Sequence, residues 1–193
     1  MDDSQWIERA RRGDLGAYDE LVQAHQEAAF RAAYLILHDA AEAQDAAQEA
    51  FVRAYDALGR FDTRRPFRPW LLRIVTNTAL NRVKASKRRQ AMAERYGSRE
   101  AALQDNPALE ARVLKRERSR RVWNAVGQLK ADDQQLLVLR YCLELSEAEL
   151  AQTFHVAAGT IKSRLHRALG KLRDVIRTHD PELLESELRP ADE

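Results

Sequence analysis

The sequence predicts an all-α protein made of two small helical domains that are joined by a flexible linker. Alanine, leucine, arginine and glutamate dominate a composition that has only 7 glycines and 5 prolines, which is typical of helices. Apolar residues recur at helical spacing along nearly every segment, and no segment sustains the alternation of a strand. Residues 93–112 contain Gly97, Ser98, Asn106 and Pro107 but little large apolar content, which indicates an interdomain linker.

The N-terminal domain is expected to span residues 1–92. Its helical spacing predicts a short helix, a turn at Gly13–Gly16, a longer helix, and a third helix that begins at Asp39. Gly59 is the expected C-terminal glycine of this third helix. Pro69 is expected as the first residue of the next helix, where its missing N–H has no intrahelical partner to lose.

The C-terminal domain is expected to span residues 113–178 and to end in a helix-turn-helix. Ser146 and Glu149 form a capping box that opens "SEAELAQTF". A tight turn then leads into the basic helix "AAGTIKSRLHRALGKLR", the spacing of a helix-turn-helix whose second helix enters the major groove. Its small core is predicted to consist of Leu150, Ala151, Val156, Ile161 and Leu165. The chain ends in an acidic tail, residues 179–193, and its last dozen residues are expected to fray.

Charge is distributed in blocks that the net charge of +2 conceals. Residues 1–59 carry 5 basic and 12 acidic side chains, whereas residues 60–95 carry 11 basic and 2 acidic ones. Residues 157–178 carry 6 basic side chains and 1 acidic one. Two separate basic blocks predict two places that meet a polyanion, and the acidic start predicts a partner of a different kind.

Several classes of protein are excluded by what the sequence lacks. Cys142 is the only cysteine, so neither a disulfide nor a zinc framework can form within the chain, as expected for a cytosolic protein. The N-terminus is acidic without an apolar core, and no apolar run is long enough to cross a bilayer. The five histidines are scattered, and there is no glycine-rich phosphate loop. We therefore expect no enzyme, no metal and no cofactor.

The first basic block places an aromatic ring on a polar helix face. At about 100° per residue, one stripe holds Trp70, Arg73, Asn77, Asn81, Lys84 and Arg88. The opposite side, with Leu71, Val75, Thr78 and Ala79, can face a core. Arginine and lysine attract phosphates, asparagine reads base edges, and aromatic rings stack on unpaired bases, which indicates nucleic acid with unstacked bases. The alternative is a solvated basic helix whose tryptophan covers a neighbouring helix.

The second basic block predicts outward-facing side chains near the start of the second helix: Thr160, Lys162, Ser163, His166 and Arg167. The alternative for this block is an ordinary basic helical hairpin. For the whole chain, the rivals are an enzyme and an autonomous helix-turn-helix regulator that binds duplex DNA by itself. The first basic block argues against the regulator, because duplex binding does not need exposed aromatic side chains.

Three segments, taken in order, resemble the sigma-70 family of bacterial transcription factors, in its compact extracytoplasmic-function (ECF) group. "DAAEAQDAAQEAFVRAY" is similar to the polymerase-binding helix, "FDTRRPFRPWLLRIVTNTALNRVK" to the promoter-melting segment, and "GTIKSRLHRALGKLR" to the recognition helix. The resemblance covers about residues 10–175. It implies a factor that binds core RNA polymerase, directs it to −35 and −10 promoter elements and helps to melt the DNA.

The resemblance also implies roles for particular residues. Asp45, Gln48 and Glu49 match positions that bind the β′ clamp helices of the polymerase. Phe67, Trp70, Arg73, Asn77 and Asn81 match the segment that melts the −10 element and captures a flipped base, with Lys84 and Arg88 further along the same stripe. Lys162, Ser163, His166 and Arg167 match the −35 readers, with Thr160 and Arg164 on or near phosphates.

The expected partners are core RNA polymerase (through the β′ clamp helices and the β flap), promoter DNA and an anti-sigma factor; neither a small-molecule substrate nor membrane insertion is expected. Two positions depart from the family pattern. Phe154-His155 stands where the turn usually has glycine, so His155 is expected to adopt the left-handed conformation. Ala157 stands where proline or serine is frequent.

Overall fold

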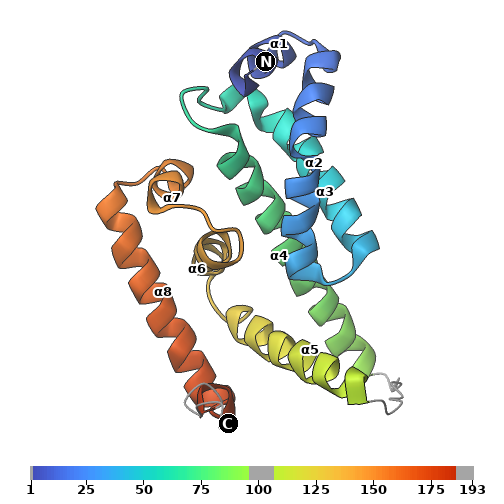
Figure 1. The fold of residues 1–193 in the computed structure, drawn as a ribbon, viewed down its shortest axis with the longest axis vertical. Coiled ribbons are helices and arrows are strands. Elements are labelled where there is room, and N and C mark those ends of the chain that lie inside the picture. Colours follow the sequence, from blue (N-terminus) through green and yellow to red (C-terminus); the bar gives the residue numbers. More distant parts are fainter. Residues whose placement is uncertain (1, 96–106, 186–193) are drawn as a thin grey trace.

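The regular structure is entirely helical in residues 2–95 and 107–185, the part of the chain that the computed structural model describes (Figure 1). The N-terminal domain contains α1 (Asp3–Arg11), α2 (Leu15–Leu37), α3 (Ala40–Ala57), the 3₁₀ turn η1 (Leu58–Arg60) and α4 (Phe67–Arg95). The C-terminal domain contains α5 (Pro107–Val126), α6 (Ala131–Leu137), the π-helical turn η2 (Val138–Cys142), α7 (Glu147–Phe154), α8 (Ala158–His179) and α9 (Glu182–Glu185). The predicted all-α fold with two helical domains is confirmed.

Aspartate caps fix where the long N-terminal helices begin. The Asp14 carboxylate accepts the N–H of Ala17 at 3.1 Å, and the Asp39 carboxylate accepts the N–H of Glu42 at 2.9 Å. Between α2 and α3 the chain turns at His38, whose φ of 56° is left-handed. Each cap satisfies an N–H that lacks an intrahelical partner, so the predicted start at Asp39 is confirmed.

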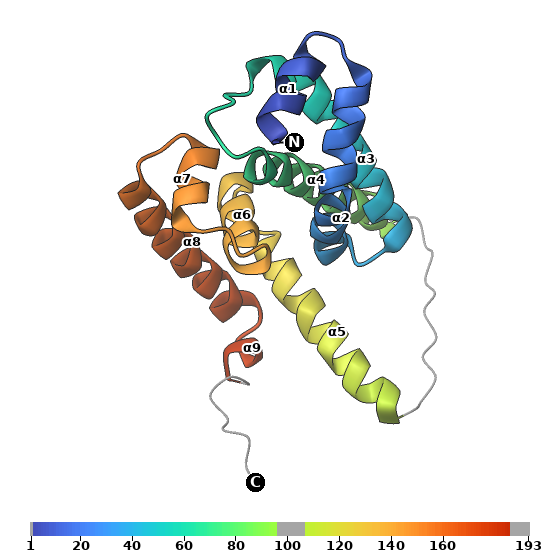
Figure 2. The same cartoon turned by 45° about the horizontal axis from the view of Figure 1, so that its top comes forward.

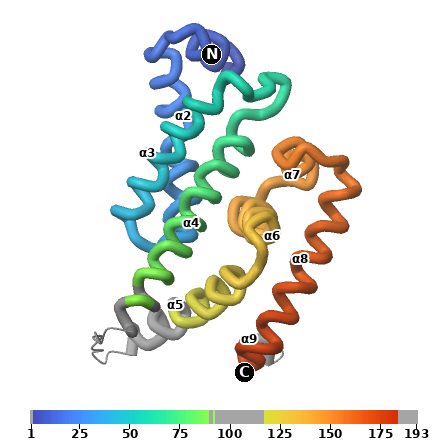
Figure 3. Tube along the Cα trace, turned by 180° about the vertical axis from the view of Figure 1, so that it is seen from behind, coloured from blue at the N-terminus to red at the C-terminus, as the bar shows by residue number. Residues whose placement is uncertain are grey.

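The contact between α2 and α3 is built largely from alanine. Small side chains allow two helices to approach closely along their packing ridges. The helices lie side by side against one side of α4 (Figures 1 and 3). The buried alanines of the two helices are Ala17, Ala29, Ala32 and Ala33 of α2 and Ala43, Ala46, Ala47, Ala50 and Ala54 of α3.

Two expected boundaries of this domain are wrong in detail. Gly59 does not end α3 in a left-handed conformation, because α3 ends at Ala57 and the chain continues into η1, which the buried Leu58 anchors. Helix α4 begins at Phe67, two residues before Pro69. A proline is still accommodated there, because the N–H groups of a first helical turn have no intrahelical acceptor.

The helix-turn-helix forms as its sequence predicts. Ser146 and Glu149 make both bonds of the capping box, with the Glu149 N–H at 3.2 Å from the serine hydroxyl and the Ser146 N–H at 2.8 Å from the carboxylate. His155 occupies the left-handed region at φ 56° and ψ 45°. The predicted core is also confirmed, because Leu150, Ala151, Ile161 and Leu165 are buried and Val156 packs against them.

The start of the acidic tail packs against the C-terminal domain instead of fraying. Leu183 of α9 is buried with Ala125 of α5 and Ile176 of α8. The Arg121 guanidinium binds the Asp180 carboxylate, with Nε at 2.6 Å from Oδ2. Residues 186–193 of the predicted tail lie outside the described residues.

Both ends of the predicted linker, residues 93–112, are helical. Helix α4 continues to Arg95, and α5 begins at Pro107. The middle of the predicted linker, residues 96–106, lies outside the described residues.

The two domains pack against each other along α4. Helix α6 lies between α4 and α8, and α7 lies near the loop that precedes α4 (Figures 1 and 2). Val138 of η2 is buried with Ile36 of α2 and with Ala79 and Leu80 of α4. The apolar core therefore runs across the boundary between the domains.

Candidate nucleic-acid interface

The N-terminal end of α4 carries an aromatic cluster. The Trp70 ring is partly buried, with its centroid 4.7 Å from that of Phe61 and 5.5 Å from that of Phe67. Phe67 is 2% exposed, so its ring supports Trp70 and offers no free face to a base. The predicted grouping of Phe67 with the DNA-facing residues is corrected in this respect, because the ring faces the core.

The rest of the predicted stripe lies along one polar side of α4. Asn77, Asn81 and Arg88 are exposed, whereas Arg73 and Lys84 are partly buried. The residues predicted to face the core on the other side, Leu71, Val75, Thr78 and Ala79, are all buried. The predicted division of α4 into a buried and a polar side is thus confirmed. The two asparagines are exposed between cations, where their amide groups can reach base edges.

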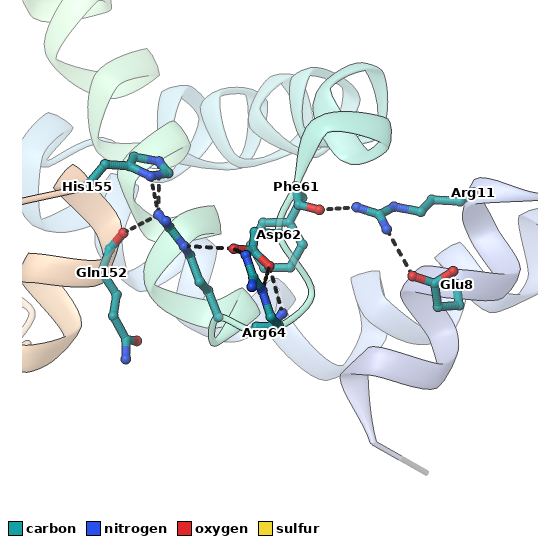
Figure 4. Close-up of polar contacts among 8 residues, drawn as sticks. Glu8, Arg11, Phe61, Asp62, Arg64, Gln152 and His155 are labelled. Atoms are coloured by element: carbon teal, nitrogen blue, oxygen red, sulfur yellow. Dashed lines mark hydrogen bonds and ion pairs between the residues drawn. The ribbon is translucent and has the colours of Figure 1, made fainter.

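The loop before α4 is held in place by contacts from α1 and by contacts within the loop (Figure 4). Arg11 of α1 donates to the carbonyl of Leu58 at 3.0 Å and also to the carbonyl of Phe61. Within the loop, the Asp62 carboxylate accepts the Arg64 side chain and its backbone N–H, and these bonds hold the pKa of Asp62 below its ordinary value. These residues were not predicted from the sequence, although the spacing Asp62-x-Arg64 is typical of a turn in which an aspartate side chain accepts a backbone N–H two residues on.

The exposed side of α8 carries the predicted −35 readers. Thr160, Lys162, Ser163, His166 and Arg167 are all exposed on this helix, which forms one edge of the molecule (Figure 1). Arg164 differs from them, because its guanidinium lies over the Phe154 ring at 5.1 Å and reaches Asp132 at 4.0 Å. We therefore assign Arg164 a share in holding α7 against α8, in addition to any contact with phosphates.

The acidic side of α3 is coupled to α4 through Arg82, a residue that the sequence analysis did not single out. The guanidinium lies 2.9 Å from Glu49, 3.1 Å from Glu42 and 3.9 Å from Asp45. Its hydrogen bond to Glu49 lowers the pKa of that carboxyl below the ordinary value. Of the three predicted polymerase-binding residues, Asp45 and Gln48 are exposed and can contact a partner, although Asp45 lies at the edge of the Arg82 cluster, whereas Glu49 is partly buried and hydrogen-bonded to Arg82.

Two exposed apolar side chains extend the same side of α3. Val52 is 63% exposed and Tyr55 is 37% exposed, and they follow Asp45 and Gln48 at spacings of three and four residues. Large exposed apolar side chains beside charged ones are typical of protein-binding surfaces. Val52 and Tyr55 could have been predicted from the sequence, because they continue the helical spacing of Asp45 and Gln48.

The described residues contain no group of three or more histidine, cysteine, aspartate or glutamate side chains placed to hold a metal ion. Within the same ranges, no helix is long and apolar enough to cross a membrane.

Comparison with known proteins matches both domains to established families. Residues 21–89 match the model of sigma-70 region 2, and residues 119–172 match a model of sigma-70 region 4. The chain is 37% identical over 172 residues to RNA polymerase sigma-H factor of Pseudomonas aeruginosa, a match that covers 86% of this chain and 89% of that protein. It is 30% identical over 177 residues to the ECF RNA polymerase sigma factor SigW of Bacillus subtilis, covering 89% and 95%.

A solved structure supports the same assignment. The chain resembles CnrH, solved in complex with the cytosolic domain of CnrY, with a TM-score of 0.54 and 25% identity over 92% of this chain and 99% of that one. The helical regions 2 and 4 and these relatives define a transcription initiation factor. The chain belongs to the extracytoplasmic-function group of the sigma-70 family.

Proposed function

We infer that this chain binds core RNA polymerase, directs it to promoters with −35 and −10 elements and promotes melting of the −10 region. The observation that carries this inference is the presence of two chemically different DNA faces in one chain. The exposed side of α8 offers cations and hydroxyls suited to a duplex groove. The polar side of α4 offers asparagines and a tryptophan beside cations, which suits unpaired bases.

We assign the two DNA faces to two promoter elements. Lys162, Ser163, His166 and Arg167 read the −35 duplex, with Thr160 nearby at the start of α8. On α4, Trp70 and Asn77 contact the melted −10 strand, and Arg73, Asn81, Lys84 and Arg88 complete that face. The family matches support this division, because the α4 residues lie in the segment that matches region 2 and the α8 residues lie in the segment that matches region 4.

We assign the polymerase contact to the side of α3 that carries Asp45 and Gln48, extended by Val52 and Tyr55. An acidic stripe with an apolar end suits a basic helical partner such as the β′ clamp helices. The β flap is the second expected contact. An anti-sigma factor is a further partner, by analogy with CnrH, which was solved with the cytosolic domain of CnrY.

We further propose that the chain acts in the cytoplasm and has no catalytic activity of its own, since transcription chemistry belongs to the polymerase. The decisive experiment compares run-off transcription from a duplex promoter with transcription from the same promoter premelted at −10, each with core polymerase alone and with this chain added. Initiation on the duplex should require the chain. Tight, specific binding to promoter duplex without polymerase would instead identify an autonomous regulator.

A further inference from the structure

A cleft of about 650 Å³ lies between the second half of α4 and the end of α5. On α5 it is lined by Arg120, Trp123 and Asn124, which share one face of the helix because they are three and four residues apart. On α4 it is lined by Lys84 and Lys87, which are three residues apart. Its volume falls within the range of about 300–1,000 Å³ that is typical of small-molecule sites.

The cations of this cleft lack acidic partners. Among the described residues, no carboxylate pairs with Lys84, Arg89 or Arg120, all of which line the cleft. Lys87 donates to the neutral amide of Asn124 at 2.8 Å, and loss of water around its ammonium lowers the pKa of Lys87 below its ordinary value. A bound anion would stabilise the charged form of each of these groups.

The two carboxylates that line the cleft are engaged elsewhere. The Asp39 carboxylate caps α3 by accepting the N–H of Glu42 at 2.9 Å. The Glu42 carboxylate accepts the Arg82 guanidinium at 3.1 Å. Five lysines and arginines line the cleft against these two carboxylates, so its net charge is positive and its ligand should be an anion.

Two aromatic rings also line the cleft. Trp123 is partly buried and packs against the apolar cluster that contains Ile36 and Leu80. The His38 ring lies edge-on to it, with 6.2 Å between the ring centroids. A planar aromatic ligand can stack on a side chain of this kind, and nucleobases do so whatever their sequence.

The wall of the cleft further contains an acceptor without a partner. Gln134 is 0% exposed, and its Nε2 donates to the carbonyls of Gly127 at 3.0 Å and Leu129 at 2.8 Å. These two bonds fix the orientation of the amide. Its Oε1 accepts no hydrogen bond from the described residues, which is unfavourable for a buried polar atom. An N–H group of a ligand would satisfy it.

We propose that this cleft binds a nucleoside polyphosphate whose base carries an N–H donor. The base stacks on Trp123 and donates to Oε1 of Gln134, and the phosphates lie among Lys84, Lys87 and Arg120. A bare polyphosphate would leave the ring and the acceptor unused, and an uncharged aromatic molecule would leave the cations without a partner. This site goes beyond the proposed function, which does not depend on it.

The base is best tested from the side of the ligand, because replacing Gln134 would also break its bonds to Gly127 and Leu129. Isothermal titration calorimetry of the full chain compares ATP and GTP with tripolyphosphate and with purine riboside triphosphate, whose base has no N–H. Relative to the tighter of ATP and GTP, purine riboside triphosphate should bind about fivefold more weakly through one lost hydrogen bond. Tripolyphosphate, which also loses the stacking, should bind more than tenfold more weakly.

The cations are tested by substitution. Arg120→Gln and Lys84→Gln should each weaken binding of the tighter nucleotide roughly fivefold or more, because each removes a charge-assisted contact. The matched control is Arg12→Gln. Arg12 is exposed and follows α1, at the end of the N-terminal domain away from α5 (Figure 1), so this variant should bind like the parent.

The position of the ligand is read from the indole N–H signals of the three tryptophans, assigned in NMR spectra with Trp6→Phe and Trp70→Phe. The tighter nucleotide should shift the Trp123 signal and leave that of Trp6 unchanged. A shift at Trp70 in place of Trp123 would overturn the proposal, because the nucleotide would then lie on the aromatic cluster at the start of α4.

Three calorimetric results would also overturn it. These are no binding of either nucleotide, binding of tripolyphosphate or purine riboside triphosphate as tightly as the nucleotides, and equal weakening by Arg12→Gln and Arg120→Gln. The last two would show attraction of polyanions by charge alone. None of these results bears on transcription from the −35 and −10 elements, so failure of the site and failure of the proposed function remain distinguishable.

Discussion

Replacing Trp70 by alanine tests the −10 assignment most sharply, because this side chain packs in the aromatic cluster and is also the one proposed to stack on an unpaired base. Its ring packs on Phe61 and Phe67 at centroid distances of 4.7 and 5.5 Å. Two aromatic pairs, each contributing about 0.5–1.5 kcal/mol, and the partial burial of the ring give a loss of about 2–3 kcal/mol in unfolding free energy. At about 2–4 °C per kcal/mol for a chain of this length, Tm should fall by roughly 4–12 °C.

Lower stability alone therefore does not decide between packing and strand capture, and a second variant is needed. Asn77 is exposed, so Asn77→Ala should change the unfolding free energy by less than about 0.5 kcal/mol. If α4 captures bases, Trp70→Ala removes stacking of about 1–3 kcal/mol per base, and Asn77→Ala removes amide contacts to a base edge. Both should slow promoter opening, whereas the exposed control Gln26→Ala should not.

The assay is stopped-flow fluorescence of 2-aminopurine in the −10 element of the non-template strand, with reconstituted holoenzyme well below the Tm of each variant. Trp70→Ala should lower the opening rate roughly tenfold or more, as expected for a stacking loss above about 1.4 kcal/mol. Core binding and −35 affinity should be unchanged. If both variants open the promoter at the parent rate while Trp70→Ala still melts several degrees lower, Trp70 is a packing residue and the strand-capture assignment fails.

Three further predictions concern the other surfaces. Asp45→Arg should weaken co-purification with core polymerase at least tenfold, on the order expected when a charge is reversed at an interface. Glu20→Arg on α2 makes the same charge change and should have no effect, so equal yields from the two variants would refute the α3 assignment. Arg167→Ala should reduce discrimination between the correct and a mismatched −35 element by about 1–3 kcal/mol, and it should leave transcription from a premelted template unchanged. An equal loss of transcription on duplex and premelted templates would show that Arg167 does not read the −35 element. Because loss of water around the ring and the nearby cations Arg65 and Arg73 lower the pKa of His155 below its ordinary value of 6.5, the unfolded chain gains the proton first, so the stability of the fold should decrease as the pH falls from about 7.5 through 6.5. A Tm that falls equally over this range in His155→Gly would refute this origin.

The sequence was sufficient for the parts of the fold that depend on local rules. Asp39 and Ser146 cap their helices as expected because an N-cap depends on a side chain and the next few N–H groups. His155 takes the left-handed conformation because it is the C-cap of α7 before a tight turn, a position where helices commonly end in this conformation. The buried and polar sides of α4 also follow from helical periodicity alone.

Tertiary context explains what the sequence did not predict. Phe67 is grouped with the DNA-facing residues by its sequence, and only the packing of Phe61 and Trp70 around it shows that its ring is internal. Arg82 is one cation among many in its block, and its role appears only once α3 and α4 are adjacent. The contact between Arg73 and Thr153 joins residues 80 positions apart, a separation that periodicity and capping rules do not reach.

His155, which stands where the family usually has glycine, combines a local conformation that the sequence predicts with a tertiary contact that it does not. A glycine at position 155 would adopt φ 56° without strain, and the helix-turn-helix would form equally well. Arg65, in the loop before α4, donates to the imidazole of His155, and glycine has no side chain that could accept this hydrogen bond. Histidine tolerates the left-handed region less well than glycine, so its presence is better explained by what its ring contacts than by the turn itself. The residue that makes the turn harder to form is thus the one that bonds the helix-turn-helix to the loop before α4, and His155→Gly would relieve the first effect while removing the second.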